Sequence, residues 1–331
     1  MLSTKELKGC APMDYLLSET PICRLVSSVN GNNLFMKRED LLPFSFGGNK
    51  ARIANKYFEE IIAKKYDFVI SYGSSSSNMN RVVANLCKRI EIPCYVIIPR
   101  EKNIKGETYN SKLLDLLEAT IIYCDEDKVA TTIKNVMEEA ANKGFKPYYI
   151  YGNEYGKGNE KVAIQAYKEV YEEIIKQEND KKIHFDYIFL ASGTGMTQTG
   201  LISGQYEKRH SPRVVGISIA RNQQQGIEKI YNNMLTLYNK KDAEDIKKII
   251  QFEDQYIADG YGQYNNKIVR VIKEVLMDDG VALNTTYTGK AFWGMLEYIK
   301  EKKIKEKNIL FINTGGTPLF FNDLNFFYEG E

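Results

Sequence analysis

Residues 186–200 read DYIFLASGTGMTQTG, an apolar segment that runs into a turn rich in glycine and hydroxyl residues. The apolar part, 186–191, predicts a buried strand, and a helical pattern begins directly after the turn. Backbone N–H groups at such a helix start bind anions, so the stretch 191–200 predicts a phosphate cradle. It is not a Walker loop, and Gln198 stands where the GxGxxG fingerprint needs its third glycine. A small phosphorylated cofactor therefore fits better than a nucleotide.

The same alternation of strand and helix extends along the chain. We expect strands at residues 33–37, 67–71, 94–98, 120–123, 148–151, 186–191, 214–219 and 309–313. We expect helices at 51–64, 78–89, 128–142, 161–176, 265–278 and 289–302. This order predicts an α/β fold with parallel-rich sheets flanked by helices, whose ligands bind at the carboxyl ends of the strands. Residues 222–264 look helical and polar with no strand, either a cover for the cleft or a solvated helical pair.

Length and charge exclude several classes of protein. The 331 residues predict two domains, and 45 basic against 43 acidic residues give a net charge of only +2. A broad cationic face for nucleic acid is therefore not expected. No apolar run approaches the roughly 20 residues that span a bilayer, so we expect no membrane insertion. The N-terminus carries no pattern of a secretory signal, and we expect a cytoplasmic protein.

Cysteines and histidines indicate neither disulfides nor a metal. The five cysteines form no CxxC pair and are odd in number, which argues against a disulfide framework and a zinc site. The two histidines, His184 and His210, are too few for a histidine-based metal centre, and we expect each in a surface or loop position. Catalysis by a histidine acid or base is not expected for the same reason.

Three other clusters lie at predicted strand ends or before helices. In Ser45–Arg52, two glycines precede Lys50, a candidate amine nucleophile or else a solvated lysine. In Ser71–Arg81, a run of serines precedes a helix, so Ser77 or Asn78 falls near the N-cap and free amides suit a substrate carboxylate. The alternative is an ordinary serine-rich turn.

The last cluster and a pair of tyrosines complete the candidate residues. In Phe311–Pro318, two glycines allow close ligand approach and Thr314 offers one neutral hydroxyl. Tyr261 and Tyr287 are both flanked by glycines, although either could simply pack in the interior.

Taken together, these motifs resemble the fold-type II pyridoxal-phosphate enzymes, and within them the D-cysteine desulfhydrase and 1-aminocyclopropane-1-carboxylate (ACC) deaminase group. The resemblance runs from Thr20-Pro21 through Lys37–Asp40 and Gly47–Lys50 to Thr314–Gly316. It implies a two-domain fold like that of the tryptophan synthase β subunit, a homodimer, and pyridoxal 5′-phosphate as cofactor. The larger cofactor domain would comprise residues 1–50 and 160–331, and the smaller substrate-side domain residues 51–159.

The resemblance also implies a role for each candidate residue. Lys50 is similar to the Schiff-base lysine, Asn78 to the residue that bonds the cofactor 3′-oxygen, and Ser77 to the residue that meets the substrate carboxylate. Tyr261 and Tyr287 resemble the two tyrosines over the reacting carbon, and Thr314 the partner of the pyridine nitrogen. The phosphate cradle would consist of Gly193, Thr194, Gly195, Met196 and Thr197.

Departures from the family pattern bear on the substrate. The chain has Ser76–Met79 in place of Gln-Ser-Asn-His, Asn284-Thr285 in place of Asp-Pro, and Asn313 in place of histidine. Thr288 stands where ACC deaminases carry glutamate, which disfavours ring opening of ACC. We therefore expect β-elimination from a small amino acid to a 2-keto acid and ammonia. The alternatives are a β-replacement synthase, an ACC deaminase, and a catalytically silent cofactor-binding protein.

Overall fold

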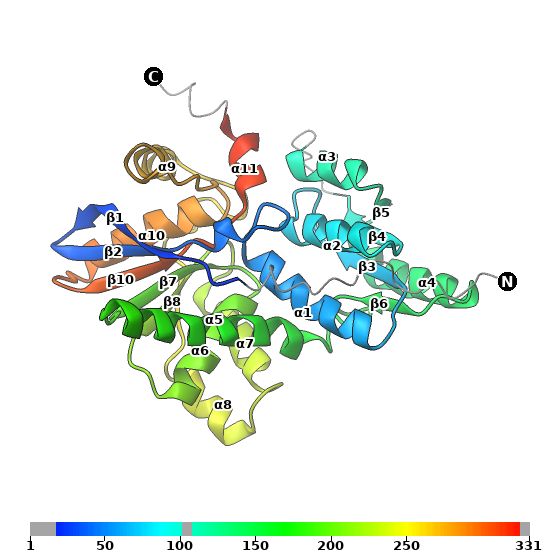
Figure 1. Cartoon of the computed structure of the whole chain (residues 1–331), viewed down its shortest axis with the longest axis horizontal. Coiled ribbons are helices and arrows are strands. Elements are labelled where there is room, and N and C mark those ends of the chain that lie inside the picture. The colour runs from blue at the N-terminus through cyan, green and yellow to red at the C-terminus, as the bar shows by residue number, and fades with distance from the viewer. Residues whose placement is uncertain (1–17, 101–107, 325–331) are drawn as a thin grey trace. The chain divides into compact units, whose positions relative to one another are not determined.

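The computed structural model describes residues 18–100 and 108–324, and these divide into two compact units (Figure 1). Of the described residues, the first unit holds Ser18, Pro43–Ser45, 50–100 and 108–162. The second unit holds Glu19–Leu42, Phe46–Asn49 and 163–324. Which unit serves the cofactor and which the substrate stays a prediction.

The first unit is built on a four-stranded parallel sheet in the order β5-β4-β3-β6. Its elements are α1 (Asn49–Ala63), β3 (Phe68–Tyr72), α2 (Asn78–Arg89), β4 (Cys94–Pro99), α3 (Tyr109–Leu116), β5 (Thr120–Cys124), α4 (Val129–Asn142) and β6 (Pro147–Tyr149). Strand β3 is buried along most of its length because α2 and α4 both pack against it. Its carboxyl end leads directly into the serine run and the start of α2.

The second unit is built on a six-stranded sheet in the order β1-β2-β10-β7-β8-β9, in which only β1 runs antiparallel to its neighbour. Its strands are β1 (Ile22–Val29), β2 (Asn32–Lys37), β7 (Tyr187–Ser192), β8 (Arg213–Ser218), β9 (Gln251–Glu253) and β10 (Asn308–Ile312). Its helices are α5 (Glu160–Lys181), α6 (Met196–Lys208), α7 (Gln223–Met234), α8 (Lys240–Lys247), α9 (Asn266–Asp279), α10 (Thr288–Glu301) and α11 (Thr317–Asn322). The α/β prediction is confirmed.

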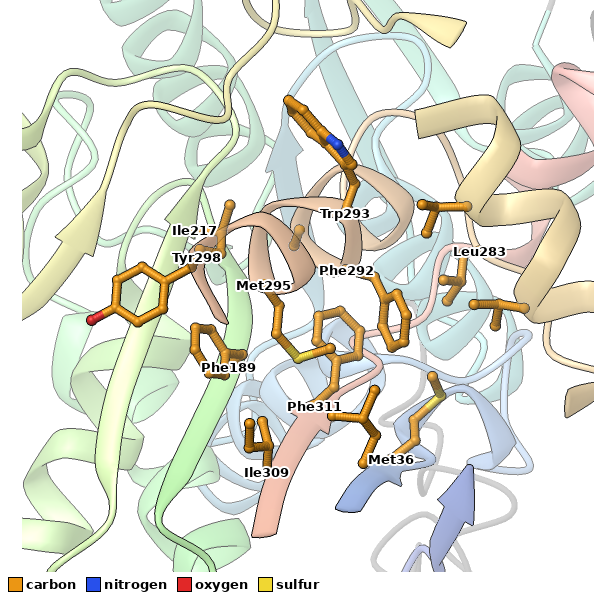
Figure 2. Close-up of a cluster of buried hydrophobic side chains, with 14 of the residues drawn as sticks. Met36, Phe189, Ile217, Leu283, Phe292, Trp293, Met295, Tyr298, Ile309 and Phe311 are labelled. Carbon is orange, nitrogen blue, oxygen red and sulfur yellow. The ribbon is translucent and has the colours of Figure 1, made fainter. Parts of the chain in front are cut away.

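A continuous hydrophobic core joins the six-stranded sheet to α9 and α10 (Figure 2). Phe292 of α10 and Phe311 of β10 meet edge to face with ring centroids 5.0 Å apart. Met36 and Met295 fill the space between the larger side chains, as flexible thioethers commonly do. This packing fixes the carboxyl ends of β7 and β10, which carry two of the candidate motifs.

The structure corrects the expectation for residues 222–264. Helices α7 and α8 are present, but β9 follows them and extends the sheet beside β8. Phe252 of β9 is fully buried, and a side chain at Gly226 of α7 would lie 2.3 Å from its ring. The segment is therefore part of the second unit's core. Among the described residues, no helix is both long and apolar enough to cross a bilayer.

Candidate active site

The turn after β7 forms a cradle of backbone N–H groups at the start of α6. Gly195 is the N-cap of α6 and has φ +79°, a left-handed conformation that glycine adopts without strain. Within the described chain, the N–H groups of residues 194–197 donate to no acceptor. The carbonyl of Gly193 accepts a hydrogen bond from the Arg221 guanidinium, which holds the turn in place. Such a cradle suits a phosphate group.

Thr197 connects the cradle to the turn that precedes Lys50. Its side chain is buried, and its Oγ1 accepts a hydrogen bond from Asn49 Nδ2 at 3.0 Å. The backbone N–H of Asn49 donates to the carbonyl of Thr314 at 3.0 Å. Asn49 is thus held to two motifs at once, and Lys50 is the next residue in the chain.

Replacing Thr197 with valine is expected to weaken cofactor retention by roughly tenfold or more. A hydrogen bond to a charged group contributes on the order of 1.5–3 kcal/mol, and the Asn49 side chain would also lose its acceptor. Equilibrium dialysis of the holoenzyme measures the loss, and Thr197→Ser, which keeps the hydroxyl, is the control. If Thr197→Val retains the cofactor as well as the parent does, the phosphate lies elsewhere.

The backbone of the motif Gly47-Gly48 lies so close to the turn after β10 that a side chain would not fit at Gly48. Gly48 has φ +92°, and a Cβ there would lie 2.7 Å from the carbonyl oxygen of Thr314. A Cβ at Gly315 would lie 2.5 Å from the Cα of Gly48. Ser45 and Phe46 just before the motif are also left-handed, with φ values of 48° and 60°. Strained backbone of this kind clusters at functional sites.

Lys50, in the first turn of α1, has an amine of unusually low basicity. Burial disfavours the charged ammonium and lowers its pKa from 10.5 to about 8. Its Nζ has no hydrogen-bond or ion-pair partner among the residues that the structure describes. A substantial share of the amine is therefore neutral near physiological pH, which is the form that acts as a nucleophile or base.

Ser77 and Asn78 stand at the N-terminus of α2, where the serine run predicted a helix start. Ser77 is the N-cap, and its Oγ accepts from the N–H of Asn80 at 3.3 Å. The Oδ1 of Asn78 accepts from Arg81 at 2.6 Å and from Asn110 at 3.0 Å. This arrangement fixes the amide group so that the Asn78 Nδ2 is left to donate; no acceptor for it exists in the described chain.

Polar groups without protein partners lie at the carboxyl ends of β7 and β10. Ser192 Oγ and Asn313 Nδ2 are buried and have no hydrogen-bond partner in the described part of the chain. Thr314 is buried, and its hydroxyl likewise has no described partner. Buried polar groups normally find partners, so these positions fit a bound polar ligand. The neutral Thr314 hydroxyl suits the neutral nitrogen of a pyridine ring.

The two predicted tyrosines lie together although 26 residues separate them. Their hydroxyl oxygens are 2.5 Å apart, and the rings meet edge to face at 6.0 Å. Asn284 holds Tyr287 by accepting its backbone N–H at 2.8 Å, and its Nδ2 donates to the Gly315 carbonyl at 3.0 Å. An aspartate could not make that second bond. The asparagine that departs from the family pattern therefore joins the tyrosine turn to the turn after β10.

Lys290, one helical turn after Tyr287, holds the loop that carries Tyr261. Its side chain is buried, and its Nζ donates to the carbonyls of Ile257 at 2.9 Å and Gly260 at 2.7 Å. Burial lowers its pKa to about 8. The lysine therefore fixes the backbone of the loop that carries Tyr261.

Replacing Lys290 with methionine is expected to lower kcat and to destabilise the fold. The change leaves two partly buried carbonyls without their donor, which costs on the order of 1 kcal/mol, and it releases the Tyr261 loop. Steady-state kinetics and thermal unfolding measure the two effects, with the exposed Lys300→Met on the same helix as control. A lower melting temperature with unchanged kcat would mean that Lys290 has no positioning role.

The contacts that three residues make with the candidate site residues were missed by reasoning from the sequence. Arg81 and Asn110 are buried and fix Asn78, and Asn284 fixes Tyr287. Arg81 follows Asn78 by three positions on a helix, a spacing that could have revealed it. The structure assigns Lys50, Ser77 and Asn78 to the first unit, and it assigns the cradle, Thr314 and the tyrosines to the second.

The first unit carries a lysine amine of lowered pKa, and the second carries an anion cradle and an unpartnered neutral hydroxyl; each of these features suits a phosphorylated, carbonyl-reactive cofactor. The profile of the pyridoxal-phosphate-dependent enzymes matches residues 13–315, so the chain belongs to that family. Its fold is fold-type II, and its cofactor is pyridoxal 5′-phosphate.

Solved structures support this assignment. A crystallised ACC deaminase homologue superposes with a TM-score of 0.80 at 25% identity, covering 95% of this chain and 94% of the other. A hydrogen sulfide-producing enzyme of Fusobacterium nucleatum gives a TM-score of 0.65 at 20% identity, covering 91% and 96% of the two chains. Threonine deaminase isoform 2 of Solanum lycopersicum gives 0.66 at 17% identity, covering 96% and 87%. The last two structures are less than 25% identical to this chain, so their similarity is evidence for the fold alone.

Proposed function

We propose that this enzyme is a D-cysteine desulfhydrase-like lyase that acts on a small amino acid with a β-leaving group. The substrate and one water would give a 2-keto acid, ammonia and the protonated leaving group. The observation that carries this proposal is the environment of Thr288, which stands where ACC deaminases have glutamate. Its Oγ1 accepts the backbone N–H and the side-chain Nδ2 of Asn284, each at 3.0 Å. The position is buried, its hydroxyl is occupied by Asn284, and it offers no carboxylate for ring opening.

Each candidate residue has a distinct task in this reaction. The residues 193–197 hold the cofactor phosphate, and Asn78 Nδ2 donates to the cofactor's ring oxygen. Ser77 and the free amides at the start of α2 bind the substrate carboxylate. The neutral Lys50 amine takes the α-proton at Nζ, and the hydroxyl pair of Tyr261 and Tyr287 moves a proton to the departing group. When bound, pyridoxal phosphate withdraws electrons from the α-carbon.

Product analysis with a substrate panel tests the proposal. The holoenzyme is incubated with D- and L-cysteine, D- and L-serine, a β-chloro amino acid and ACC, and keto acid, ammonia and leaving group are quantified. Equimolar keto acid and leaving group from a β-substituted amino acid are expected. A four-carbon 2-keto acid from ACC would favour the ACC deaminase alternative, and a new β-substituted amino acid formed with added thiol would favour a synthase. No product from any compound would favour a silent binding protein.

Two tyrosine-to-phenylalanine variants add a control to this assay. Tyr261→Phe removes a hydroxyl that touches Tyr287, whereas Tyr155→Phe alters a side chain that is 72% exposed. Under the proposed function, only the first variant slows product formation. The homodimer and the cytoplasmic location stay predictions of the family resemblance and the sequence.

A further inference from the structure

Both histidines of the chain lie beside one buried carboxylate in the second unit. Glu178 is near the end of α5, His184 is in the loop between α5 and β7, and His210 is in the loop between α6 and β8. His210 Nε2 lies 3.2 Å from Glu178 Oε2, and His184 Nδ1 lies 3.5 Å from Glu178 Oε1. The nearest ligand atoms of the three residues all lie within 4.8 Å of one another. The sequence has only two histidines, which is why no histidine-based metal centre was expected and each histidine was placed in a surface or loop position.

The outer nitrogen of each imidazole contacts a hydroxyl group. His210 Nδ1 lies 2.8 Å from the Tyr171 hydroxyl, and His184 Nε2 lies 3.1 Å from Ser211 Oγ. Each hydroxyl can accept the outer N–H, which leaves the inner nitrogen as a lone pair directed at the Glu178 side. Partners of this kind orient histidines that bind metals.

Glu178 offers one oxygen that protein groups do not use. Its Oε1 accepts the backbone N–H of Phe185 at 2.7 Å, which fixes the carboxylate. Its Oε2 is buried and receives no hydrogen bond from any described residue. Oε2 lies 3.2 Å from His210 Nε2, and a cation bound between them would balance the buried carboxylate, whose pKa burial otherwise raises.

The surrounding loops are held in place before any ligand binds. The carbonyl of His184 accepts from Asn308 Nδ2 at 2.9 Å, and the next residue, Phe185, is buried. Gln205 Nε2 donates to the Pro212 carbonyl at 2.6 Å and so fixes the loop after His210. His210 also lines an open hollow of about 480 Å³, so an ion can reach the group from solvent.

We propose that Glu178, His184 and His210 bind one divalent transition-metal ion of the zinc type. Two ligand atoms at 2.0–2.1 Å from a tetrahedral zinc stand about 3.3–3.4 Å apart. The 3.2 Å between His210 Nε2 and Glu178 Oε2 is close to that spacing, and a small rotation of the exposed His184 ring would bring its Nδ1 to the same ion. Two imidazoles and one carboxylate select zinc and its neighbours over magnesium or calcium, which prefer all-oxygen sites. The bound ion would fasten the α5–β7 loop to the α6–β8 loop, and a water would complete its coordination.

Zinc titration of the holoenzyme against a chromophoric chelator tests the site. The parent is expected to bind one zinc per chain with micromolar affinity or better and to unfold at a higher temperature with zinc than without. His184→Gln and His210→Gln should each weaken binding at least tenfold and lose the thermal shift. Glu172→Gln, an exposed carboxylate on the same helix, should change neither.

Two outcomes would overturn the proposal. One is a parent that binds no zinc at micromolar concentration, in which case Glu178 and the histidines form only a hydrogen-bonded cluster. The other is unchanged zinc affinity in His184→Gln and His210→Gln, which would place the ion at cysteine thiols such as the exposed Cys23. Cobalt(II) distinguishes that case, because thiolate ligands give an intense near-ultraviolet charge-transfer band that nitrogen and oxygen ligands lack. His184 is exposed, so its substitution leaves folding intact.

Discussion

Lys50→Ala is expected to remove the covalent link between the chain and pyridoxal phosphate and to reduce turnover by at least 10²–10⁴-fold, roughly the contribution of a positioned proton carrier. The physical reason is the amine's lowered pKa of about 8, which results from burial. An exposed lysine has a pKa near its ordinary value and is almost fully charged at neutral pH, so an exposed lysine cannot replace Lys50.

Borohydride reduction followed by mass spectrometry of peptides checks this expectation. The parent should carry the cofactor on the peptide that contains Lys50, and Lys50→Ala should carry it nowhere. Lys64→Ala, which removes an exposed lysine just after the end of the same helix, should label and turn over like the parent. A reducible linkage that persists in Lys50→Ala would show that another lysine holds the cofactor.

The order of secondary structure was predictable because each parallel strand is a short apolar run followed by an amphipathic helix. The β1–β2 hairpin was missed, although its turn is Asn30-Gly31 with φ values of 53° and 74°, a strong local signal. Strand β1 could not be recognised from the sequence because it is half exposed and mixes polar with apolar residues. Strand β9 has only three residues, and its one buried residue, Phe252, is explained by contacts with a helix distant in the sequence.

The candidate site was predictable where one peptide segment carries the whole feature. The glycine turn at 193–197, the N-cap at Ser77 and the lysine at the start of α1 are all local patterns. Partnerships between distant segments were not predictable in this way. Asn110 reaches Asn78 across 32 positions, and the two histidines meet only because their loops flank neighbouring strands. Tertiary packing, rather than any periodicity, creates those contacts.

Gly195→Asp is expected to reduce pyridoxal-phosphate affinity more than any other single change in the cradle. The φ of +79° strains most side chains, and a Cβ there would lie 3.0 Å from Cγ1 of Ile230. The dominant effect is charge, because a carboxylate beside the phosphate replaces a neutral N–H cradle with like-charge repulsion in a partly buried turn. Two unit charges 4 Å apart repel by about 4 kcal/mol at an effective dielectric constant of 20, which corresponds to a loss on the order of 10³-fold.

The variant Gly195→Asn separates the effect of the added charge on cofactor affinity from the steric effect of the added side chain. Asparagine has nearly the size of aspartate and tolerates a left-handed backbone, so it carries the steric cost of the Ile230 contact without the repulsion. Gly144→Asp places the same acid at a left-handed glycine with open space around it and should leave affinity unchanged. Fluorescence titration of each apoenzyme with pyridoxal phosphate should rank the parent and Gly144→Asp first, Gly195→Asn next and Gly195→Asp last. Equal affinities for Gly195→Asn and Gly195→Asp would mean that no phosphate lies near residue 195, and the anion cradle would have to be assigned elsewhere.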